Sequence, residues 1–500
     1  MHDSLIPTGV SLRSMLTEGF RPTGASDFRA TSCTSDWRKV RRGDVFIALT
    51  EADQDGHDHA TEAVKRGAAA VICERHLPVF NIPQFVVADS RTAYGRLCQA
   101  LVGNPSQQMK VIGVAGTHGK STVARLMTSI FREAGNAAGT LDSFGYWDGL
   151  EDNPPLGSLL TPPSLARSLA QMSAAGVWHA MLELSSRELS QSVAAGVALD
   201  AVCLTNLSRD HRNRHGSPEN YRRAIGRVFE HLNSDGIAIL NADDPDCVRM
   251  LDDLNHPALT IGLKQPAEIT AEVVEQHANE QVFMLTAGDE TVGVRTAMIG
   301  DHHLYNCLSA AAMALAYGVE LTTIARGLEA VDRLPGRMER VICGQEFAVF
   351  VDAAYSADSL RACLRAARGV TSGRLICVFG SDCDSGGSDR PLIGRVAGAM
   401  ADLSIATSGG ANLEHLNDLC AQLACGATDP AKVRLIGERQ QAIAAALEEA
   451  RAGDTVVIAG MGDRPYGRLD EDHLPLDDCE IVRQVLRGQK STVTYPRLAA

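Results

Sequence analysis

The chain has 500 residues, a formal net charge of −14 and no long run of Lys or Arg. This length suffices for about three domains, and 45% hydrophobic with 22% charged residues is typical of a globular protein. An acidic chain without a basic stripe argues against a nucleic-acid-binding surface, although it allows a local positive site for a small anion.

The N-terminal residues MHDSLIPTGVSLRSML lack the basic and apolar regions of a secretory signal, and no apolar run is long enough to span a membrane. The 13 cysteines include no CxxC pair, so we expect reduced, buried thiols. We therefore expect a cytoplasmic protein without membrane insertion, working as a monomer.

Residues 1–107 are predicted to form a small α/β domain. Short β-rich runs at 43–49, 71–74 and 85–88 surround a helical pattern at 61–70. The turn-rich segment 102–110 then predicts a linker.

Residues 108–333 alternate predicted strands with helical patterns. Further strands are expected at 179–185, 200–206 and 236–242, helices at 164–176, 218–233 and 309–318, and β-hairpins between 265 and 298. This alternation predicts a parallel sheet covered by helices on both faces.

Residues 334–500 are predicted to form a second, doubly wound α/β domain. Its strands are expected at 347–353, 374–380, 402–408, 432–437 and 455–460, with helices between them.

The stretch GVAGTHGKST, residues 113–122, follows an apolar run and precedes a helical pattern. It departs from the usual phosphate-loop pattern, because Val114 stands where that pattern has glycine. Backbone N–H groups from Gly116 to Gly119 can still face anionic oxygens at a helix N-terminus. Lys120 can reach the β- and γ-phosphates, and Ser121 can ligate Mg²⁺. The alternative is an ordinary strand–turn–helix junction.

Two further residues are candidates for a metal site. Glu183 ends a predicted strand and His211 follows another, and ligands of open α/β sheets bind at the carboxyl ends of strands. A carboxylate and an imidazole beside ATP phosphates would suit Mg²⁺. Taken singly, each would be interpreted as a surface or capping residue.

Motifs along nearly the whole chain resemble those of the Mur ligases, most closely the E type, which adds the third residue of the peptidoglycan stem peptide. They are SDWRKVRRGDVFIAL, GTHGKST, LTPPSL, LELSS, TNLSRDH, NADD, LPGRME, VDAAYSADSL, DRPLIG and AGMG. Their number and unchanged order make a chance match implausible.

The resemblance implies a three-domain α/β Mur ligase architecture, with a central P-loop parallel-sheet ATPase domain and a C-terminal doubly wound, Rossmann-like domain. The three domains would bind the UDP end of a UDP-N-acetylmuramoyl-peptide, ATP with Mg²⁺, and the incoming amino acid. ATP would phosphorylate a substrate carboxylate, and the amine would displace phosphate to form an amide.

The resemblance also implies residue roles. Catalysis would involve Lys120, Glu183 and His211, and the metal would be held by Ser121, Glu183 and His211. ATP would be bound by Gly116, Thr117, His118, Gly119, Lys120, Ser121, Thr122, Asn306, Arg337, Asp352 and Tyr355. Ser35, Asp36 and Arg38 would lie near the uridine end of the substrate, and Thr161, Ser185 and Gln191 would line the muramoyl path. Arg390 would also bind substrate.

The chain departs from the family pattern at the second metal site. Ile225 stands where the family carries a carbamylated lysine that holds the second Mg²⁺. An isoleucine cannot ligate a metal, so we consider Arg222, Arg223 and Arg227 as substitutes that neutralise the acyl phosphate.

Other departures affect substrate contacts. Arg187, Val193, His303 and Tyr355 replace a family His, Arg, Asn and His, respectively. The residues that match the diaminopimelate-reading DNPR are Gly409 to Asn412, and GKGHE has become residues 460–464, GMGDR. Without the arginine fork for a distal carboxylate, diaminopimelate is not the expected substrate.

Three interpretations follow. The first is an ATP-dependent ligase with an altered choice of amino acid. The second is a non-catalytic paralogue that binds nucleotide or UDP-sugar and acts as a regulator or partner. The third, an unrelated P-loop ATPase or kinase, leaves the N- and C-terminal motifs unexplained.

Overall fold

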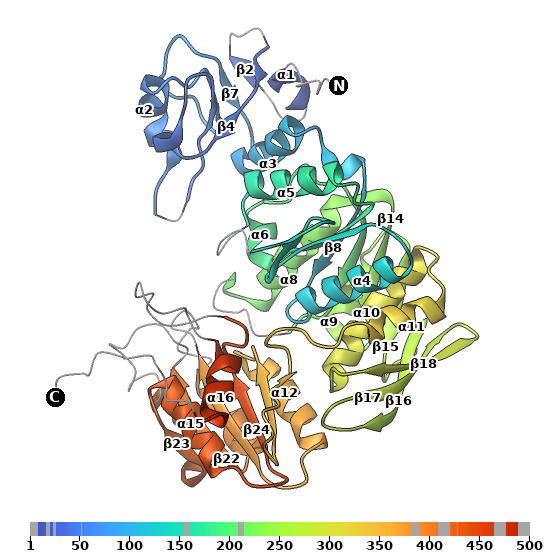
Figure 1. The fold of residues 1–500 in the computed structure, drawn as a ribbon. Coiled ribbons are helices and arrows are strands. Elements are labelled where there is room, and N and C mark those ends of the chain that lie inside the picture. The colour runs from blue at the N-terminus through green and yellow to red at the C-terminus, as the bar shows by residue number, and fades with distance from the viewer. Residues whose placement is uncertain are drawn as a thin grey trace, which may run out of the picture.

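The computed structural model describes residues 9–16, 21–23, 27–51, 53–154, 160–208, 215–381, 390–408, 421–427, 429–464 and 477–488. Three α/β units follow one another, from the N-terminal unit in blue to the C-terminal unit in orange and red (Figure 1). Each unit has its own sheet, as the alternation of strand and helix patterns predicts.

The N-terminal unit is built on a five-stranded sheet in the order β2-β7-β6-β5-β4. The strands are β2 (Arg21–Thr23), β4 (Cys33–Thr34), β5 (Val45–Ile47), β6 (Ala70–Cys73) and β7 (Gln84–Val86), with β1 (Val10–Ser11) and β3 (Arg29–Ala30) paired separately. The helices are α1 (Leu12–Met15), α2 (Ala60–Lys65) and α3 (Ser90–Leu101). The helix predicted over 61–70 stops at Lys65, because Gly67 turns the chain at φ 108° into β6.

Helix α3 fastens this unit to the next one. A Cβ on Gly95 would lie 2.7 Å from the Cβ of Ala195, so only glycine allows this approach. Ala166 of the central unit also belongs to the same apolar core as Leu97 of α3. The segment predicted as a linker over 102–110 is short and partly ordered as a 3₁₀ turn, Pro105–Gln107.

The central sheet has 11 strands in the order β11-β10-β9-β12-β8-β13-β14-β15-β16-β17-β18. Its strands are β8 (Lys110–Ala115), β9 (Ala138–Asp142), β10 (Gly145–Trp147), β11 (Asp152–Asn153), β12 (His179–Glu183), β13 (Leu199–Leu204), β14 (Leu232–Asn241), β15 (Ala258–Gly262), β16 (Ile269–Gln276), β17 (Gln281–Ala287) and β18 (Glu290–Thr296). The strands β9-β12-β8-β13-β14-β15-β16 are parallel. At one edge β10 and β11 pair antiparallel, and at the other the predicted hairpins β16–β17–β18 extend the sheet antiparallel.

Helices cover both faces of this sheet, which confirms the predicted layering. They are α4 (Lys120–Glu133), α5 (Pro162–Ala174), α6 (Ser186–Ser190), α8 (Pro218–Gly226), α9 (Pro245–Asp252), α10 (Asp301–Ala316) and α11 (Leu321–Glu329). One core joins α4, α10 and α11, and a second joins α5, α6 and α8. The helix predicted over 218–233 is shorter: α8 gives way to a 3₁₀ turn, Arg227–His231, and β14 begins at Leu232.

The C-terminal unit has a six-stranded sheet in the order β19-β20-β24-β21-β22-β23, with two buried cores, one on each face. Its elements are β19 (Glu339–Arg340), β20 (Ala348–Asp352), β21 (Leu375–Ser381), β22 (Leu403–Ser408), β23 (Val433–Leu435), β24 (Thr455–Ala459), α12 (Ala357–Gly369), α13 (Arg390–Met400), α15 (Arg439–Glu449) and α16 (Asp478–Leu486). All strands but β19 run parallel, which is the doubly wound arrangement expected.

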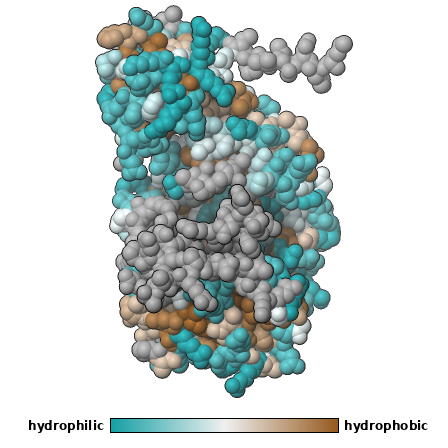
Figure 2. All heavy atoms as spheres, turned by 60° about the vertical axis from the view of Figure 1, so that its left-hand side comes forward, coloured by the Kyte–Doolittle hydropathy of each residue, from teal (hydrophilic) through white to brown (hydrophobic). Residues whose placement is uncertain are grey.

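Among the residues that the structure describes, no helix combines the length and the apolar character needed to cross a membrane. The cysteines in these ranges are free, and most of them are buried, as predicted. On the face seen in Figure 2, hydrophilic residues cover much of the N-terminal unit, and apolar residues gather on the C-terminal unit.

Candidate active site

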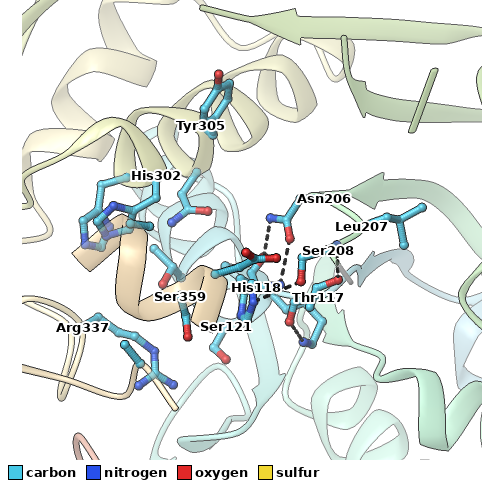
Figure 3. Close-up of a pocket in the computed structure, with 18 of the residues that line it drawn as sticks. Thr117, His118, Ser121, Asn206, Leu207, Ser208, His302, Tyr305, Arg337 and Ser359 are labelled. Atoms are coloured by element: carbon cyan, nitrogen blue, oxygen red, sulfur yellow. Dashed lines mark hydrogen bonds between the residues drawn. The ribbon is translucent and has the colours of Figure 1, made fainter. Parts of the chain in front are cut away.

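A cavity of about 790 Å³ lies where the central unit meets the C-terminal unit. The central unit contributes the loop after β8, the end of β12, the residues after β13 and β14, and the start of α10. The C-terminal unit contributes the residues around Arg337, the end of β20 and the loop after β24. The predicted residues Lys120, Glu183 and Asp352 therefore line one cavity. Figure 3 shows other residues of its wall, among them Ser121 and Arg337.

Two glycines shape the loop between β8 and α4. Gly116 has φ 131° and Gly119 has φ 85°, a region that disfavours side chains. A Cβ on Gly116 would lie 2.2 Å from the Oγ1 of Thr205, and one on Gly119 would lie 2.2 Å from the Oδ1 of Asn306. At these two positions the loop thus passes too close to Thr205 and Asn306 for any residue but glycine. This tight strand–loop–helix turn exposes backbone N–H groups at the start of α4, as an anion cradle requires.

The side chain of Thr117 holds the loop in place. Its Oγ1 lies 2.8 Å from the hydroxyl of Tyr221 in α8 and accepts from the backbone N–H of Ser208 at 2.9 Å. The backbone N–H of His118 donates to the Oδ1 of Asn206 at 3.0 Å, as Figure 3 shows among the dashed contacts. Thr117 is thus a supporting residue, and the sequence did not single out Asn206 and Ser208, although both lie in the quoted motif TNLSRDH.

Oxygen ligands gather at the first turn of α4. The hydroxyl of Ser121 donates to Oε2 of Glu183 at 2.7 Å, and the Nζ of Lys120 lies 3.9 Å from Oε1 of the same carboxylate. Lys120 also donates to the carbonyl of Thr117 at 3.0 Å. A hydroxyl and a carboxylate are the hard ligands that Mg²⁺ prefers, so this pair fits that ion.

The third predicted metal ligand, His211, lies outside the described residues. Within the described ranges, no three His, Cys, Asp or Glu side chains are placed together as a metal-binding group. The geometry of Ser121 and Glu183 is therefore the structural support for a metal position.

The C-terminal unit brings Arg337 and Asp352 to the cavity. Asp352 ends β20 and accepts from the backbone N–H of Met338 at 2.7 Å. Burial raises the pKa of Asp352 to about 6, although the charge of Arg337 opposes this shift. The Arg337 guanidinium lies 3.3 Å from Asp463 and 4.9 Å from the ring centre of Phe144 in the central unit.

Helix α10 begins with two histidines that the sequence did not predict as a unit. His302 and His303 line the cavity with ring centres 4.3 Å apart; His303 is buried and His302 is half-buried. Burial lowers the pKa of His302 to about 4 and that of His303 well below its usual value, so both rings are neutral. Neither ring nitrogen of His303 has a hydrogen-bond partner among the residues that the structure describes. Asn306, predicted to contact the base, follows one turn later.

The residues predicted to bind the UDP-linked substrate do not line this cavity. Ser35, Asp36 and Arg38 lie in the N-terminal unit, where Asp36 accepts from the backbone N–H of Arg38 at 2.9 Å and caps a 3₁₀ turn. Thr161 and Ser185 are the N-cap residues of α5 and α6. Both caps are side-chain hydrogen bonds that a helix start requires in any case.

Two other predicted substrate residues have protein partners. Gln191 accepts a short hydrogen bond from Arg91, which also reaches the carbonyl of Thr50, so this contact joins the first two units. Arg390 opens α13 and donates to Gln422 at 2.7 Å.

Ile225 is fully buried in the core beneath α8, so the position offers neither charge nor ligand to the cavity. Of the arginines considered as substitutes, Arg223 donates to Asn220, and Arg227 donates to the carbonyl of Ser190 and the hydroxyl of Ser192. These two are held by partners that do not line the cavity, contrary to the substitute role considered for them.

Arg222 occupies a different place. Its Nε lies 3.4 Å from Asp246, and it lines a second cavity of about 170 Å³ beside the first. Ser208, Asp246 and Arg249 line both cavities. Arg222 thus lines the second cavity and not the first, and its guanidinium is ion-paired with Asp246.

Comparison with known proteins finds matches over most of the chain. The profile of the Mur ligase middle domain matches residues 114–314, and that of the Mur ligase glutamate ligase domain matches residues 336–462. A UDP-N-acetylmuramoyl-L-alanyl-D-glutamate–2,6-diaminopimelate ligase of Geobacillus kaustophilus (strain HTA426) is 35% identical over 461 residues, covering 90% of this chain and 94% of the relative. The chain belongs to the Mur ligase family.

Further relatives of this Mur ligase cover similar lengths. The corresponding ligase of Aquifex aeolicus (strain VF5) is 32% identical over 464 residues, covering 92% of this chain and 94% of the relative. A solved structure of a UDP-N-acetylmuramoyl-L-alanyl-D-glutamate–2,6-diaminopimelate ligase superposes with a TM-score of 0.68 at 27% identity, covering 97% of this chain and all of that one. A MurF ligase of Thermotoga maritima, solved in complex with ADP, shares the fold with a TM-score of 0.63 at 17% identity, covering 92% of this chain and 97% of that one. The predicted family and fold are thereby confirmed.

Proposed function

We propose that this Mur ligase is an ATP-dependent amide ligase that adds an amino acid to a UDP-N-acetylmuramoyl-peptide through an acyl phosphate, in peptidoglycan precursor synthesis. The observation that carries the proposal is the shared cavity, in which the glycine-shaped loop and Lys120 face Arg337 and Asp352 of the C-terminal unit. The Thr117 and His118 N–H groups donate to Asn206, so the N–H donors for phosphates would come from the first turn of α4. Cations from two units surround the position where phosphoryl charge would develop.

In this proposal ATP lies along the loop from Gly116 to Thr122, with the base towards Asn306. Ser121 and Glu183 hold Mg²⁺, whose chemistry is to neutralise phosphate charge. Lys120 contacts the terminal phosphates, and Arg337, Asp352 and Tyr355 meet the nucleotide from the C-terminal unit. The N-terminal unit, with Ser35, Asp36 and Arg38, takes the UDP end. The residues that matched DNPR, 409–412, lie outside the described ranges.

The burial of Ile225 supports a second candidate function. Because the core position cannot hold a second metal, a protein that binds nucleotide and UDP-precursor without turnover is the alternative. Loss of one electrostatic partner of a transition state costs about 3 kcal/mol, which slows a reaction without abolishing binding.

ATP turnover by the full chain separates the two functions. Phosphate release would be measured with Mg²⁺, with and without UDP-N-acetylmuramoyl-dipeptide, across a panel of amino acids. Release that requires both the UDP-dipeptide and one amino acid establishes the ligase and names its amino acid. Binding of ATP and UDP-dipeptide without release under any pairing favours the non-catalytic protein. Phosphate release at the same rate with and without the UDP-dipeptide contradicts both candidate functions.

A further inference from the structure

The loop after β24 is fixed against the C-terminal unit by close backbone contacts. A Cβ on Gly462 would lie 2.7 Å from the Cβ of Ala353, and one on Gly336 would lie 2.2 Å from the backbone nitrogen of Asp463. Both glycines have positive φ, 62° and 59°. Arg464 follows Asp463 in this loop, and it lines the cavity that also contains the phosphate loop.

Three side chains form a row from the C-terminal unit to that loop. The Arg464 guanidinium lies 5.8 Å from the ring centre of Tyr355, within cation–π range. The Tyr355 ring in turn meets the His118 ring edge-on, with centres 6.4 Å apart. Because His118 belongs to the phosphate loop, Tyr355 places the solvent-exposed Arg464 beside that loop.

The charges in the cavity wall indicate what Arg464 could bind. The cationic side chains in this wall are Lys120, Arg249, Arg337 and Arg464. Arg337 is paired with Asp463, while carboxylates such as Glu183 add negative charge to the same wall. Ile225 offers no compensating charge. A bound triphosphate therefore needs further positive charge, and a planar guanidinium contacts phosphate oxygens in pairs.

We propose that Arg464 binds the terminal phosphate of a nucleoside triphosphate in this cavity, with Tyr355 as its positioning residue. This deepens the proposed function and rests on it only in that the cavity must bind nucleotide. The prediction concerns discrimination: Arg464 should favour a triphosphate over a diphosphate, because the diphosphate lacks the group that it contacts.

Calorimetric titration of the full chain tests this with two probes in Mg²⁺, ADP and the non-hydrolysable β,γ-methylene analogue of ATP. Arg464→Met should weaken the triphosphate analogue by about tenfold or more and change ADP by less than about twofold. Arg340→Met, on an exposed arginine of β19 outside the cavity wall, is the matched control and should change neither.

Variants of Tyr355 test the positioning role. Tyr355→Phe keeps the ring and should retain triphosphate preference, whereas Tyr355→Ala should lose it as Arg464→Met does. The double variant Arg464→Met/Tyr355→Ala should be no weaker than either single one, since both act through one contact.

Each contrary outcome has a defined meaning. An unchanged ratio of the two affinities in Arg464→Met overturns the inference and leaves the proposed function intact. An effect on the KM for the amino acid alone, with both nucleotides bound normally, also overturns it and assigns Arg464 to amino-acid recognition. Failure of the unaltered protein to bind either nucleotide overturns the inference and the proposed function together.

Discussion

The hydroxyl of Ser121 donates to the carboxylate of Glu183 at 2.7 Å, between the first turn of α4 and the end of β12. Strand register produces this contact, because β12 lies beside β8 and pairs Glu183 with Val114 just before the loop. Two oxygen ligands that are 62 residues apart in the chain thus meet at the mouth of the phosphate loop.

Glu183→Gln should weaken the Mg²⁺ dependence of nucleotide binding, because a neutral amide is a poorer ligand for a hard divalent ion. We expect Mg²⁺ to strengthen ADP binding at least about tenfold less in this variant than in the unaltered protein. Titrations with Mg²⁺ and with EDTA measure this difference. Glu133→Gln, at the exposed far end of α4, is the control. Equal Mg²⁺ dependence in both variants would remove Glu183 from the metal site.

Gly119→Ala should abolish nucleotide binding, because its Cβ would lie 2.2 Å from the Oδ1 of Asn306. Gly135→Ala is a matched control: its φ is also positive, 77°, but no atom lies within 4 Å of the added Cβ. Both changes should cost about 1 kcal/mol in stability through backbone strain. ADP titration and thermal unfolding separate the two effects. Normal ADP binding by Gly119→Ala would show that the loop does not need this approach to α10.

Ile225→Lys should lower the free energy of unfolding by about 3 kcal/mol, because it places an ammonium in a fully buried apolar core. Ile225→Met conserves volume and should cost less than about 1.5 kcal/mol. Urea unfolding measures both. Equal stability of the two variants would mean that the lysine reaches the cavity from α8. If turnover then appears only in Ile225→Lys, the missing metal ligand is what limits the natural chain.

His179 should make the central unit sensitive to acid. Its ring stacks on Phe131 with centres 4.2 Å apart, and burial, aided by the charge of Lys110, lowers its pKa to about 4. Because an unfolded histidine has a pKa of about 6.5, the unfolded chain binds more protons between pH 6.5 and pH 4. The stability due to the neutral ring is therefore complete above pH 6.5 and is lost as pH falls through this window.

His179→Phe should remove this dependence. Between pH 7 and pH 5 the unaltered protein should lose about 2 kcal/mol more than the variant, and urea unfolding at the two pH values measures it. A parallel loss in both proteins would assign the acid sensitivity to other groups.

The sequence predicted the elements well wherever apolar periodicity was strong. The strands that frame the cavity were expected within a few residues, and parallel register then brings Lys120, Glu183 and Asp352 to their carboxyl ends. Helix ends were less accurate. Gly67 and the 3₁₀ turn after α8 both shorten predicted helices, since backbone conformation overrides side-chain pattern there.

Side-chain roles were harder to predict than elements. Thr161 and Ser185 were assigned to substrate, which stays a prediction; the structure shows that both are also helix caps. The Ser185–Glu188 pair has the S-x-x-E spacing of a capping box, so the sequence already held that signal. The row from Arg464 to His118 could not be predicted, because it joins residues hundreds of positions apart that only tertiary packing brings together.

The close approach of Gly95 to Ala195 and the shared core around Ala166 pack the N-terminal unit directly against the central unit. Arg91 adds a polar contact between these two units, because it donates to the carbonyl of Thr50 and to the side chain of Gln191. Closure of the cavity would then be a movement of the C-terminal unit towards the central unit. Arg337 and Arg464 would move together, because the loops that carry them are in close backbone contact at Gly336 and Gly462. The two guanidinium groups would then reach a bound nucleotide in one movement. Binding of the nucleotide and assembly of the reaction centre would therefore occur in the same step.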